Sequence, residues 1–157
     1  MKMIKHIKCD IFESGADVIC HQVNCQGVMG SGIAKQVREK YPEVYQHYVS
    51  ECKKYSPEEI LGGAQLIQVN ETTYIANLFG QNQYGYDGKV YTDYKALRNA
   101  IFETAVWVTL NEKKTIAIPY KIGCARGGGD WNIVYKMIEE VFNDSDCEVL
   151  ICEYNGG

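Results

Sequence analysis

Two glycine-rich segments constrain this chain more than any other feature of its sequence. The first, residues 24–32, follows a short apolar run at 16–23 and precedes a run of helix-forming residues. The second, residues 122–129, follows the apolar run 115–119 and precedes an amphipathic stretch that Asp130 can cap. Short apolar runs rich in β-branched residues are typical of buried strands. The order of strand, glycine loop and helix therefore occurs twice, which favours a sheet covered by helices on both faces.

Further strand and helix patterns fill the rest of the chain. We expect other strands at 2–7, 64–69, 73–79 and 147–154, and helices that begin at 33, at 42, at 93 with Thr92 as the cap, and after Asp130. The strands at 64–69 and 73–79 lie in a hairpin-like arrangement, so we expect a mixed sheet. The helix from 42 carries an apolar stripe, including Tyr48, that is typical of a core-facing helix. We therefore predict an α/β fold, a three-layer α/β/α sandwich, formed by residues 1–157 as a single domain.

Residues 80–91 predict a long surface loop. They hold three glycines, three tyrosines and a single aliphatic residue, Val90. Long loops in compact domains often carry function. Asp87 within this loop and Asp93 just after it are candidate catalytic carboxylates. The alternative interpretation of Asp87 is a solvated loop residue, and that of Asp93 is the start of a helix.

The composition excludes several classes of protein. The chain has 16 Lys and Arg against 20 Asp and Glu, a formal net charge of −4, so it lacks the basic surplus that gathers nucleic-acid backbones. Its seven cysteines are scattered and lie mostly inside apolar runs, which indicates buried thiols in a reducing compartment. The cysteines form no CxxC pair and the three histidines lack metal-ligand spacing, so we expect no metal. No apolar run has the length of a membrane span or signal core, so we expect a cytoplasmic protein without membrane contact.

The two glycine loops have the chemistry of an anion site. Ligands of such folds lie beyond the carboxyl ends of strands, where loops enter helices. Glycine lets backbone N–H groups approach an anion, and a helix N-terminus adds about half a positive charge, which together suit a diphosphate. Gly27, Gly30 and Gly32 match neither the GxGxxG spacing nor a Walker loop, which disfavours a dehydrogenase and a kinase. Arg126 follows Cys124 too closely for the loop of a thiol phosphatase. A lone glycine loop is more often a tight turn, whereas two loops after two strands favour the anion site.

Three motifs in the order known from one protein family carry a resemblance. They are Cys9-Asp10-Ile11, the segment 23–34 (VNCQGVMGSGIA), and the segment 118–124 (IPYKIGC), which leads to Gly129-Asp130-Trp131. With them the chain resembles the macrodomain family, and within it the branch of the terminal ADP-ribose protein glycohydrolases and the ADP-ribose 1″-phosphate phosphatases. The likeness runs from about Met3 to Tyr154. It implies a three-layer fold with a mixed sheet that binds ADP-ribose in a cleft between the two glycine loops.

The resemblance implies a role for each part of this cleft. Asp10 matches the acidic residue that binds the adenine amino group, and Tyr154 lies where the family has a neighbour of the adenine. From the residues alone, a turn or cap explains Asp10 equally well, and a sheet-edge position explains Tyr154. The first loop would surround the distal ribose and the diphosphate, and the second would be the opposing phosphate loop. The implied ligand-binding residues are Asp10, Ile11, Asn24, Gly27, Val28, Met29, Gly30, Ser31, Gly32, Ile33, Gln81, Ile122, Gly123, Cys124, Ala125, Arg126, Gly127 and Tyr154.

The resemblance also offers two catalytic arrangements. In the glycohydrolase branch a lysine follows the strand at 73–79 and an aspartate lies in the second loop. Here Gln81 and, approximately, Gly127 occupy those positions, and neither can supply an amine or a carboxylate. The phosphatase branch has a histidine just before its asparagine motif, which His21 matches, and histidine is suited to proton transfer near neutral pH. We therefore predict His21 and Asn24 as catalytic residues that act with an ordered water. The alternatives are that His21 is a hydrogen-bonded histidine at a strand end and that Asn24 caps the loop.

We expect a protein that binds ADP-ribose and hydrolyses an ADP-ribosyl derivative, either ADP-ribose 1″-phosphate or an ADP-ribosylated protein or nucleic acid. We expect it to need no cofactor and to be a monomer. The alternative is a non-catalytic reader of ADP-ribose or of ADP-ribosylated partners, which the missing lysine and aspartate favour and His21 disfavours. Arg126 is a candidate phosphate ligand or a solvated arginine. Asp130 is more simply a helix cap than a catalytic acid.

Overall fold

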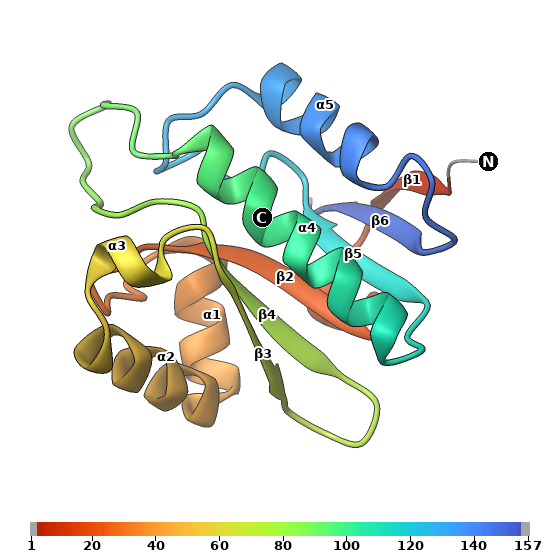
Figure 1. Cartoon of the computed structure of the whole chain (residues 1–157), viewed down its shortest axis with the longest axis horizontal. Helices are drawn as coiled ribbons and strands as arrows, with labels where there is room; N and C mark the ends of the chain where they lie inside the picture. The colour runs from red at the N-terminus through yellow and green to blue at the C-terminus, as the bar shows by residue number, and fades with distance from the viewer. Residues whose placement is uncertain (1–2, 155–157) are drawn as a thin grey trace.

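A computed structural model describes residues 3–154 as a six-stranded sheet with helices packed against it (Figure 1). The strands are β1 (Ile4–Lys8), β2 (Val18–Val23), β3 (Ala64–Gln68), β4 (Tyr74–Phe79), β5 (Thr115–Pro119) and β6 (Glu148–Glu153). The helices are α1 (Gly32–Lys40), α2 (Pro42–Lys54), α3 (Pro57–Ile60), α4 (Tyr94–Leu110) and α5 (Trp131–Val141), with a 3₁₀ helix at Ile11–Glu13. Strands and helices alternate along most of the chain, as the sequence pattern predicts.

The strand order in the sheet is β1-β6-β5-β2-β4-β3, so β2 lies in the interior between β5 and β4. The pairs run parallel except β3 and β4, which form an antiparallel hairpin with Gln65 opposite Asn77. The predicted mixed sheet is confirmed. Parallel neighbours need long crossovers, which explains why helices separate the parallel strands in the sequence.

Strand β2 shows why this sheet needs cover on both faces. Val18 and Cys20 pack into a cluster with residues of α4 and α5. Ile19, between them, packs on the other face with Val37 of α1 and Val44 of α2. Successive strand residues point to opposite faces, so this short apolar run is buried on both. Helices α4 and α5 lie side by side over one face (Figure 1), which confirms the three-layer sandwich.

Both glycine loops leave the sheet at the same edge. The carboxyl ends of the parallel strands β5, β2 and β4 meet there, and the loops that follow them are 120–130, 24–31 and 80–93. Backbone hydrogen bonds tie these loops together. The N–H of Cys25 donates to the carbonyl of Asn82 (2.9 Å), and the N–H of Tyr91 donates to the carbonyl of Gly127 (2.8 Å). The edge is therefore built from three segments that are distant in the sequence.

The prediction that Thr92 caps α4 is wrong. The cap is Asp93, whose carboxylate accepts a hydrogen bond from the N–H of Ala96 (3.0 Å). Thr92 instead donates its hydroxyl to the carbonyl of Gly123 (2.6 Å), and its backbone is paired with Gln81 at the base of the loop. The predicted strand at 115–119 matches β5, the other predicted strand ends lie within two residues of the observed ones, and the short helix α3 was not predicted. Lys2, in the predicted first strand, lies outside the described residues.

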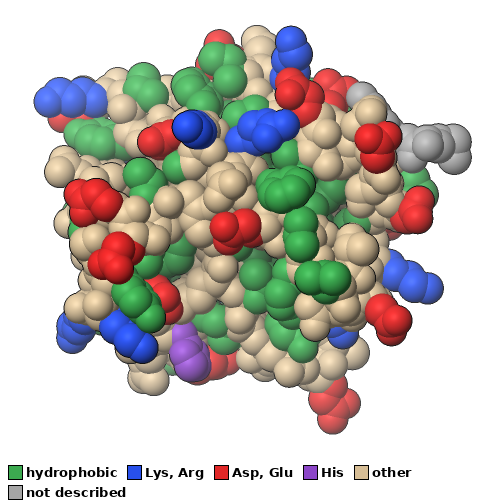
Figure 2. All heavy atoms as spheres, viewed as in Figure 1, with side chains coloured by type: hydrophobic (Ala, Val, Ile, Leu, Met, Phe, Trp, Pro, Cys, Tyr) green, Lys and Arg blue, Asp and Glu red, His purple; other side chains and the backbone are tan. Residues whose placement is uncertain are grey.

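The surface in Figure 2 mixes acidic, basic and hydrophobic side chains, as the small net charge leads one to expect. Exposed apolar residues of α4 are Phe102, Val106 and Leu110, which are spaced one helical turn apart. Within residues 3–154, no helix combines the length and the apolar character that crossing a bilayer requires.

Candidate functional site

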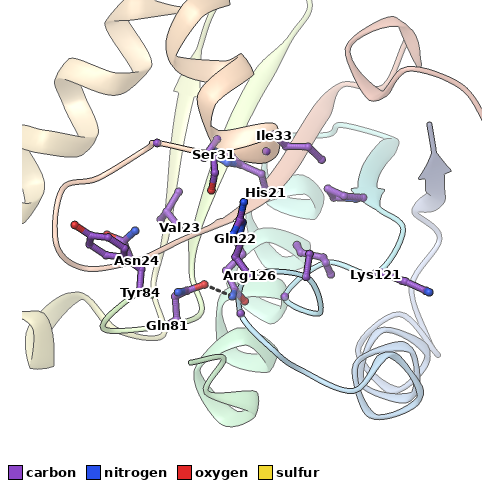
Figure 3. Close-up of a pocket in the computed structure, with 18 of the residues that line it drawn as sticks. His21, Gln22, Val23, Asn24, Ser31, Ile33, Gln81, Tyr84, Lys121 and Arg126 are labelled. Carbon is purple, nitrogen blue, oxygen red and sulfur yellow. Dashed lines mark hydrogen bonds between the residues drawn. The ribbon is translucent and has the colours of Figure 1, made fainter. Parts of the chain in front are cut away.

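A cavity of about 290 Å³ lies between the two glycine loops at the carboxyl edge of the sheet (Figure 3). Its walls come from the end of β2, the first loop, the start of α1, the 80–91 loop and the second loop. A smaller hollow of about 240 Å³ lies beside the 3₁₀ helix and the end of β6. The two hollows share Ile33, Pro119 and Tyr120 as lining residues, so they form one groove along this edge.

Most of the predicted site residues line this groove. The larger cavity is lined by His21, Asn24, Val28, Gly30, Ser31, Gly32, Ile33, Gln81, Ile122, Gly123, Ala125, Arg126 and Gly127, and the smaller hollow by Asp10, Ile11, Ile33 and Tyr154. Gly27, Met29 and Cys124 line neither. The side chain of Met29 is fully buried in a cluster with Tyr48 and Phe79, so it supports the loop from inside and does not line the groove. Cys124 turns its thiol to the carbonyl of Ile122 (3.3 Å).

The N-terminus of α1 opens on the larger cavity. Ser31 is the cap residue, but its side chain makes no capping hydrogen bond. The first N–H groups of a helix have no partner within the helix, and they carry the positive end of its dipole. Gly32, Ile33 and Ala34 of this first turn line the cavity. This end of the cavity can therefore accept an anion without a lysine.

Arg126 supplies the fixed positive charge in the wall of the cavity. Its guanidinium lies over the ring of Tyr86, 4.2 Å from the ring centre, and both residues line the cavity. Stacking on an aromatic ring holds a guanidinium in place while leaving its N–H edge available. Lys121 also borders the cavity, but its side chain points away from the other labelled residues in Figure 3. Tyr84 and Tyr86 were not predicted as site residues, although the tyrosine content of their loop is the signal that marks them.

Asn24 organises the first loop. Its Nδ2 donates to the carbonyl of Val28 (2.9 Å), and its Oδ1 accepts from the N–H of Gln26 (2.9 Å) and the hydroxyl of Tyr48 (2.8 Å). Tyr48 is fully buried in α2, and burial raises the pKa of its hydroxyl. The apolar stripe of α2 thus contains a tyrosine whose hydroxyl holds the loop. A buried tyrosine needs a hydrogen-bond partner, and that need is the only sequence signal for this contact.

His21 is 1% exposed and lies in β2. Its Nε2 is hydrogen-bonded to Oδ1 of Asn77, and its Nδ1 is buried without a hydrogen-bond partner among residues 3–154. Burial lowers the pKa of His21 to about 4, so the ring is neutral at pH 7. A neutral ring can accept a proton from a bound water or hydroxyl but holds no spare proton to donate first. The expectation of a histidine that titrates near neutral pH is therefore replaced by a neutral acceptor.

Gln81 occupies the lysine position of the glycohydrolase branch, and both ends of its amide are engaged. Its Oε1 accepts from Nε2 of Gln22 (2.6 Å), the bond drawn as a dashed line in Figure 3, and its Nε2 donates to the carbonyl of Gln83 (2.8 Å). Gln22 also donates to the hydroxyl of Thr92 (3.0 Å). These contacts join the ends of β2 and β4 to the start of α4. Gln81 therefore shapes the cavity wall and offers no nucleophile.

Gly127 occupies the approximate aspartate position, and its surroundings require glycine. A Cβ added there would lie 2.7 Å from the carbonyl oxygen of Gly123 and closer still to the hydroxyl of Thr92. Its carbonyl accepts from the N–H groups of Tyr91 (2.8 Å) and Thr92 (2.9 Å). The close approach of the two loops therefore excludes a carboxylate side chain at this position.

The remaining predicted carboxylates have local roles. Asp10 accepts from the N–H of Phe12 (2.9 Å) through one oxygen and lines the smaller hollow, so the structure accommodates both interpretations of this residue. Asp87 accepts from the hydroxyl of Tyr91 (2.8 Å), a bond that lowers the pKa of the carboxyl. Asp130 caps α5 by accepting from the N–H of Asn132 (2.9 Å). Asp87, Asp93 and Asp130 do not line the groove.

The cysteines are free thiols that lie in the interior or partly in it. All seven cysteines are free thiols, four of them buried and three partly buried. Burial raises the pKa of Cys147 to about 11 and that of Cys25 to about 12, so these thiols stay protonated and unreactive at neutral pH. Within residues 3–154, no group of three His, Cys, Asp or Glu side chains is arranged to hold a metal ion.

Two of the relatives with similar sequence are enzymes that act on ADP-ribosyl derivatives by name. ADP-ribose 1″-phosphate phosphatase of Meyerozyma guilliermondii is 29% identical over 100 residues, which cover 54% of this chain and 57% of that protein. DNA ADP-ribosyl glycohydrolase of Mycobacterium tuberculosis is 28% identical over 161 residues, which cover 99% of this chain and 43% of that protein. This chain thus spans about half the length of these relatives.

The fold is shared with solved structures, and a family model matches the chain. The structure of Thermosipho africanus DarTG in complex with ADP-ribose superimposes with a TM-score of 0.79, at 23% identity over 95% of this chain and 41% of that one. The Macro domain model matches residues 20–138, which include the end of β2, both glycine loops and most of α5. That match covers more than half of the chain, and the shared fold agrees with it. This chain therefore belongs to the macrodomain family.

Proposed function

We propose that this chain binds ADP-ribose along the groove at the carboxyl edge of the sheet. The adenine would lie in the smaller hollow beside Asp10 and Tyr154, and the distal ribose would enter the larger cavity beside His21. Ile33, which lines both hollows, marks where the diphosphate would pass. A groove of two linked hollows suits a ligand with two ribosyl halves joined by a diphosphate.

The observation that carries this proposal is the positive field of the groove in a protein of net charge −4. Three sources supply it: the N-terminus of α1, the glycine-rich backbone of the second loop, and the guanidinium of Arg126 stacked on Tyr86. The carboxylate of Asp10 lies at the other end of the groove, where an adenine amino group can donate to it. This distribution of charge fits a ligand with anionic phosphates in the middle and a hydrogen-bond donor at one end.

The second part of the proposal is that the chain hydrolyses a derivative substituted at C1″ of the distal ribose. For ADP-ribose 1″-phosphate, the oxygen of a water would attack phosphorus while the bond from phosphorus to the ribose oxygen O1″ breaks. The proton lost by the water passes to Nδ1 of His21 and from there to the departing O1″, so the proton balance closes. Because burial lowers the pKa of His21, the imidazolium formed in this way gives up its proton readily.

A second candidate function is a reader that binds ADP-ribose or ADP-ribosylated protein or nucleic acid without turnover. The specific observation in its favour is the state of the two glycohydrolase positions. The amide of Gln81 is hydrogen-bonded at both ends, and the contacts around Gly127 exclude a carboxylate. The covalent chemistry of a lysine at position 81 is therefore closed to this cavity. Removal of an ADP-ribosyl group from an acceptor would have to proceed through His21 and water.

The experiment that separates these functions starts with calorimetry of the purified protein and ADP-ribose. The same sample is then given ADP-ribose 1″-phosphate, an ADP-ribosylated peptide and ADP-ribosylated DNA, and the products are analysed. His21→Gln removes the basic nitrogen but keeps an amide N–H that can reach Asn77. Thr104→Val serves as the control, because it removes a buried hydroxyl of α4 that donates to the carbonyl of Ala100, four residues before it in the same helix.

For an enzyme we expect His21→Gln to slow turnover about 100-fold or more while the affinity for ADP-ribose changes little. Thr104→Val should match the wild type in both measurements. Binding without turnover of any of the three substrates would refute the hydrolytic part and leave the reader. No binding of ADP-ribose would refute the whole proposal, because the groove would then share only the fold of the family.

A further inference from the structure

Three side chains form a row of hydrogen bonds across the sheet beneath α1 and α2. Gln65 of β3, Asn77 of β4 and His21 of β2 occupy paired positions on neighbouring strands and point to the same face. Nδ2 of Asn77 donates to Oε1 of Gln65 (3.0 Å), and Nε2 of His21 is bonded to Oδ1 of Asn77. Asn77 is fully buried and His21 is 1% exposed, so water does not compete for the bond between them.

The partners of Gln65 on α2 fix the donor and the acceptor of every hydrogen bond in the row. Nε2 of Gln65 lies 3.1 Å from the carbonyl oxygen of His47 and 3.4 Å from the carboxylate of Glu51, both on α2. A backbone carbonyl can only accept, so Gln65 must present its NH₂ group to α2 and its oxygen to Asn77. Asn77 must then donate to that oxygen with its own NH₂ group.

The same constraint passes on to the histidine. With its NH₂ group committed to Gln65, Asn77 offers only its carbonyl oxygen to the ring of His21. Nε2 must therefore carry the ring proton, because two acceptors facing each other in a buried site would repel. A neutral imidazole has a single N–H, so Nδ1 is left as the acceptor. This is the nitrogen that has no partner among the described residues, in a side chain that lines the cavity.

We infer that Asn77, itself oriented by Gln65 and α2, is a positioning residue that keeps His21 in the tautomer whose Nδ1 is unprotonated and able to accept a proton. This inference rests on the proposed function, because it assigns a use to the nitrogen that would take the proton of the attacking water. Asn77 does not line the groove, so it acts only through His21. The row also explains why Asn77, a fully buried position of β4, carries an amide where an apolar side chain would otherwise pack.

The test uses the full chain and reads the tautomer of His21 directly by long-range ¹H–¹⁵N correlation NMR. In the wild type we expect the nitrogen pattern of a ring protonated at Nε2. Asn77→Leu replaces the amide by an apolar side chain of similar size and should give a mixture of tautomers. Gln65→Met frees the amide of Asn77 to rotate and should give a smaller change in the same direction. Asn77→Asp keeps an acceptor oxygen toward Nε2, and in its protonated form it can donate to Oε1 of Gln65, so it should restore protonation at Nε2.

Turnover of ADP-ribose 1″-phosphate and calorimetry with ADP-ribose give the second readout. We expect Asn77→Leu to lower kcat about 10-fold to 100-fold, since a wrongly held catalytic histidine loses rate, while Kd for ADP-ribose stays within about twofold. Thr104→Val, which also removes a buried hydrogen bond, should change neither. Asn77→Asp should recover part of the lost kcat.

Two results of the NMR measurement would overturn the inference. One is a wild-type His21 protonated at Nδ1, and the other is an Asn77→Leu variant that keeps the wild-type tautomer. A loss of kcat no larger than that of Thr104→Val would likewise show that Asn77 only stabilises the fold. If the wild type turns over no substrate, the hydrolytic proposal fails by itself. The tautomer spectra of the wild type and the variants still decide whether Asn77 orients His21.

Discussion

Acidification tests how His21 is held in the folded protein. Burial lowers its pKa to about 4, against an ordinary value of 6.5. In the unfolded chain the ring titrates near the ordinary value, so between these two pH values the unfolded chain binds a proton that the folded chain does not. A proton bound only by the unfolded chain stabilises that state. His21 therefore costs no stability above about pH 6.5, and the folded protein loses stability as the pH falls from 6.5 toward 4.

The two pKa values set the size of this loss. The difference between 6.5 and about 4 corresponds to about 3.4 kcal/mol once the pH lies below both values. At pH 5 the histidine of the unfolded chain is almost fully protonated and that of the folded chain is still mostly neutral. About 2 kcal/mol of stability is then lost relative to pH 7. For a domain of this size that is a large share of the total free energy of unfolding.

The assay is urea unfolding of the wild type and of His21→Gln at a series of pH values from 7 to 5. Glutamine does not titrate, and the other titrating groups are common to both proteins, so they cancel in the difference between the two free energies of unfolding. We expect the wild type to lose about 2 kcal/mol of stability relative to His21→Gln as the pH falls from 7 to 5. A difference that stays constant within about 0.5 kcal/mol would refute the reasoning, because the ring would then titrate as it does in water.

Three substitutions test the loops around the cavity. Gly127→Ala places a methyl carbon 2.7 Å from the carbonyl oxygen of Gly123, so thermal unfolding should show that the variant is about 1–3 kcal/mol less stable. A variant as stable as the wild type would contradict this close packing of the two loops. Tyr48→Phe leaves the first loop without its buried hydroxyl, so urea unfolding should show a loss of about 1–2 kcal/mol and calorimetry a weaker affinity for ADP-ribose. Gly30→Glu has room, because an added Cβ meets only Cγ1 of Val28 at 3.7 Å. Its carboxylate should raise Kd for ADP-ribose about 100-fold in calorimetry with little change in thermal stability, and tight binding would refute the assignment of the diphosphate.

The fold could be predicted because its signals are local. Runs such as 16–23 and 115–119 are too short for helices and too apolar for loops, and each is followed by glycines and then by an amphipathic stretch. Those patterns depend only on neighbours in the sequence, and they give the sandwich and the position of both loops. The capping of α4 was missed because Thr92 and Asp93 are both good caps, and only the contact with Gly123 decides between them.

The polar contacts of the site could not be predicted, because they join residues far apart in the sequence. His21 meets Asn77 at a separation of 56 residues, and Gln22 meets Gln81 at a separation of 59. Which residues face each other across two parallel strands depends on their register, and buried strands without polar alternation give no signal for it. The tautomer of the histidine depends in turn on Gln65, one strand further away. The sequence therefore gives the likeness to a family and the candidate histidine, and the structure gives the state of its ring.

The two positions where this chain departs from the glycohydrolase pattern belong to one packed unit. Gln81 accepts from Gln22, which also donates to Thr92, and the hydroxyl of Thr92 donates to the carbonyl of Gly123 next to Gly127 in space. A lysine at position 81 would leave Gln22 without this acceptor, and an aspartate at position 127 would need a Cβ where the Thr92 hydroxyl already lies. Restoring either residue alone would thus break the unit before it added a catalytic group. His21 lies next to Gln22 in β2 and points to the opposite face of the sheet. Its Nδ1, which has no partner among the described residues, is a stronger base than any amide oxygen of this unit. We therefore expect the base for hydrolysis to be His21, on the face of the sheet that α1 covers, and not a residue of the 80–91 loop.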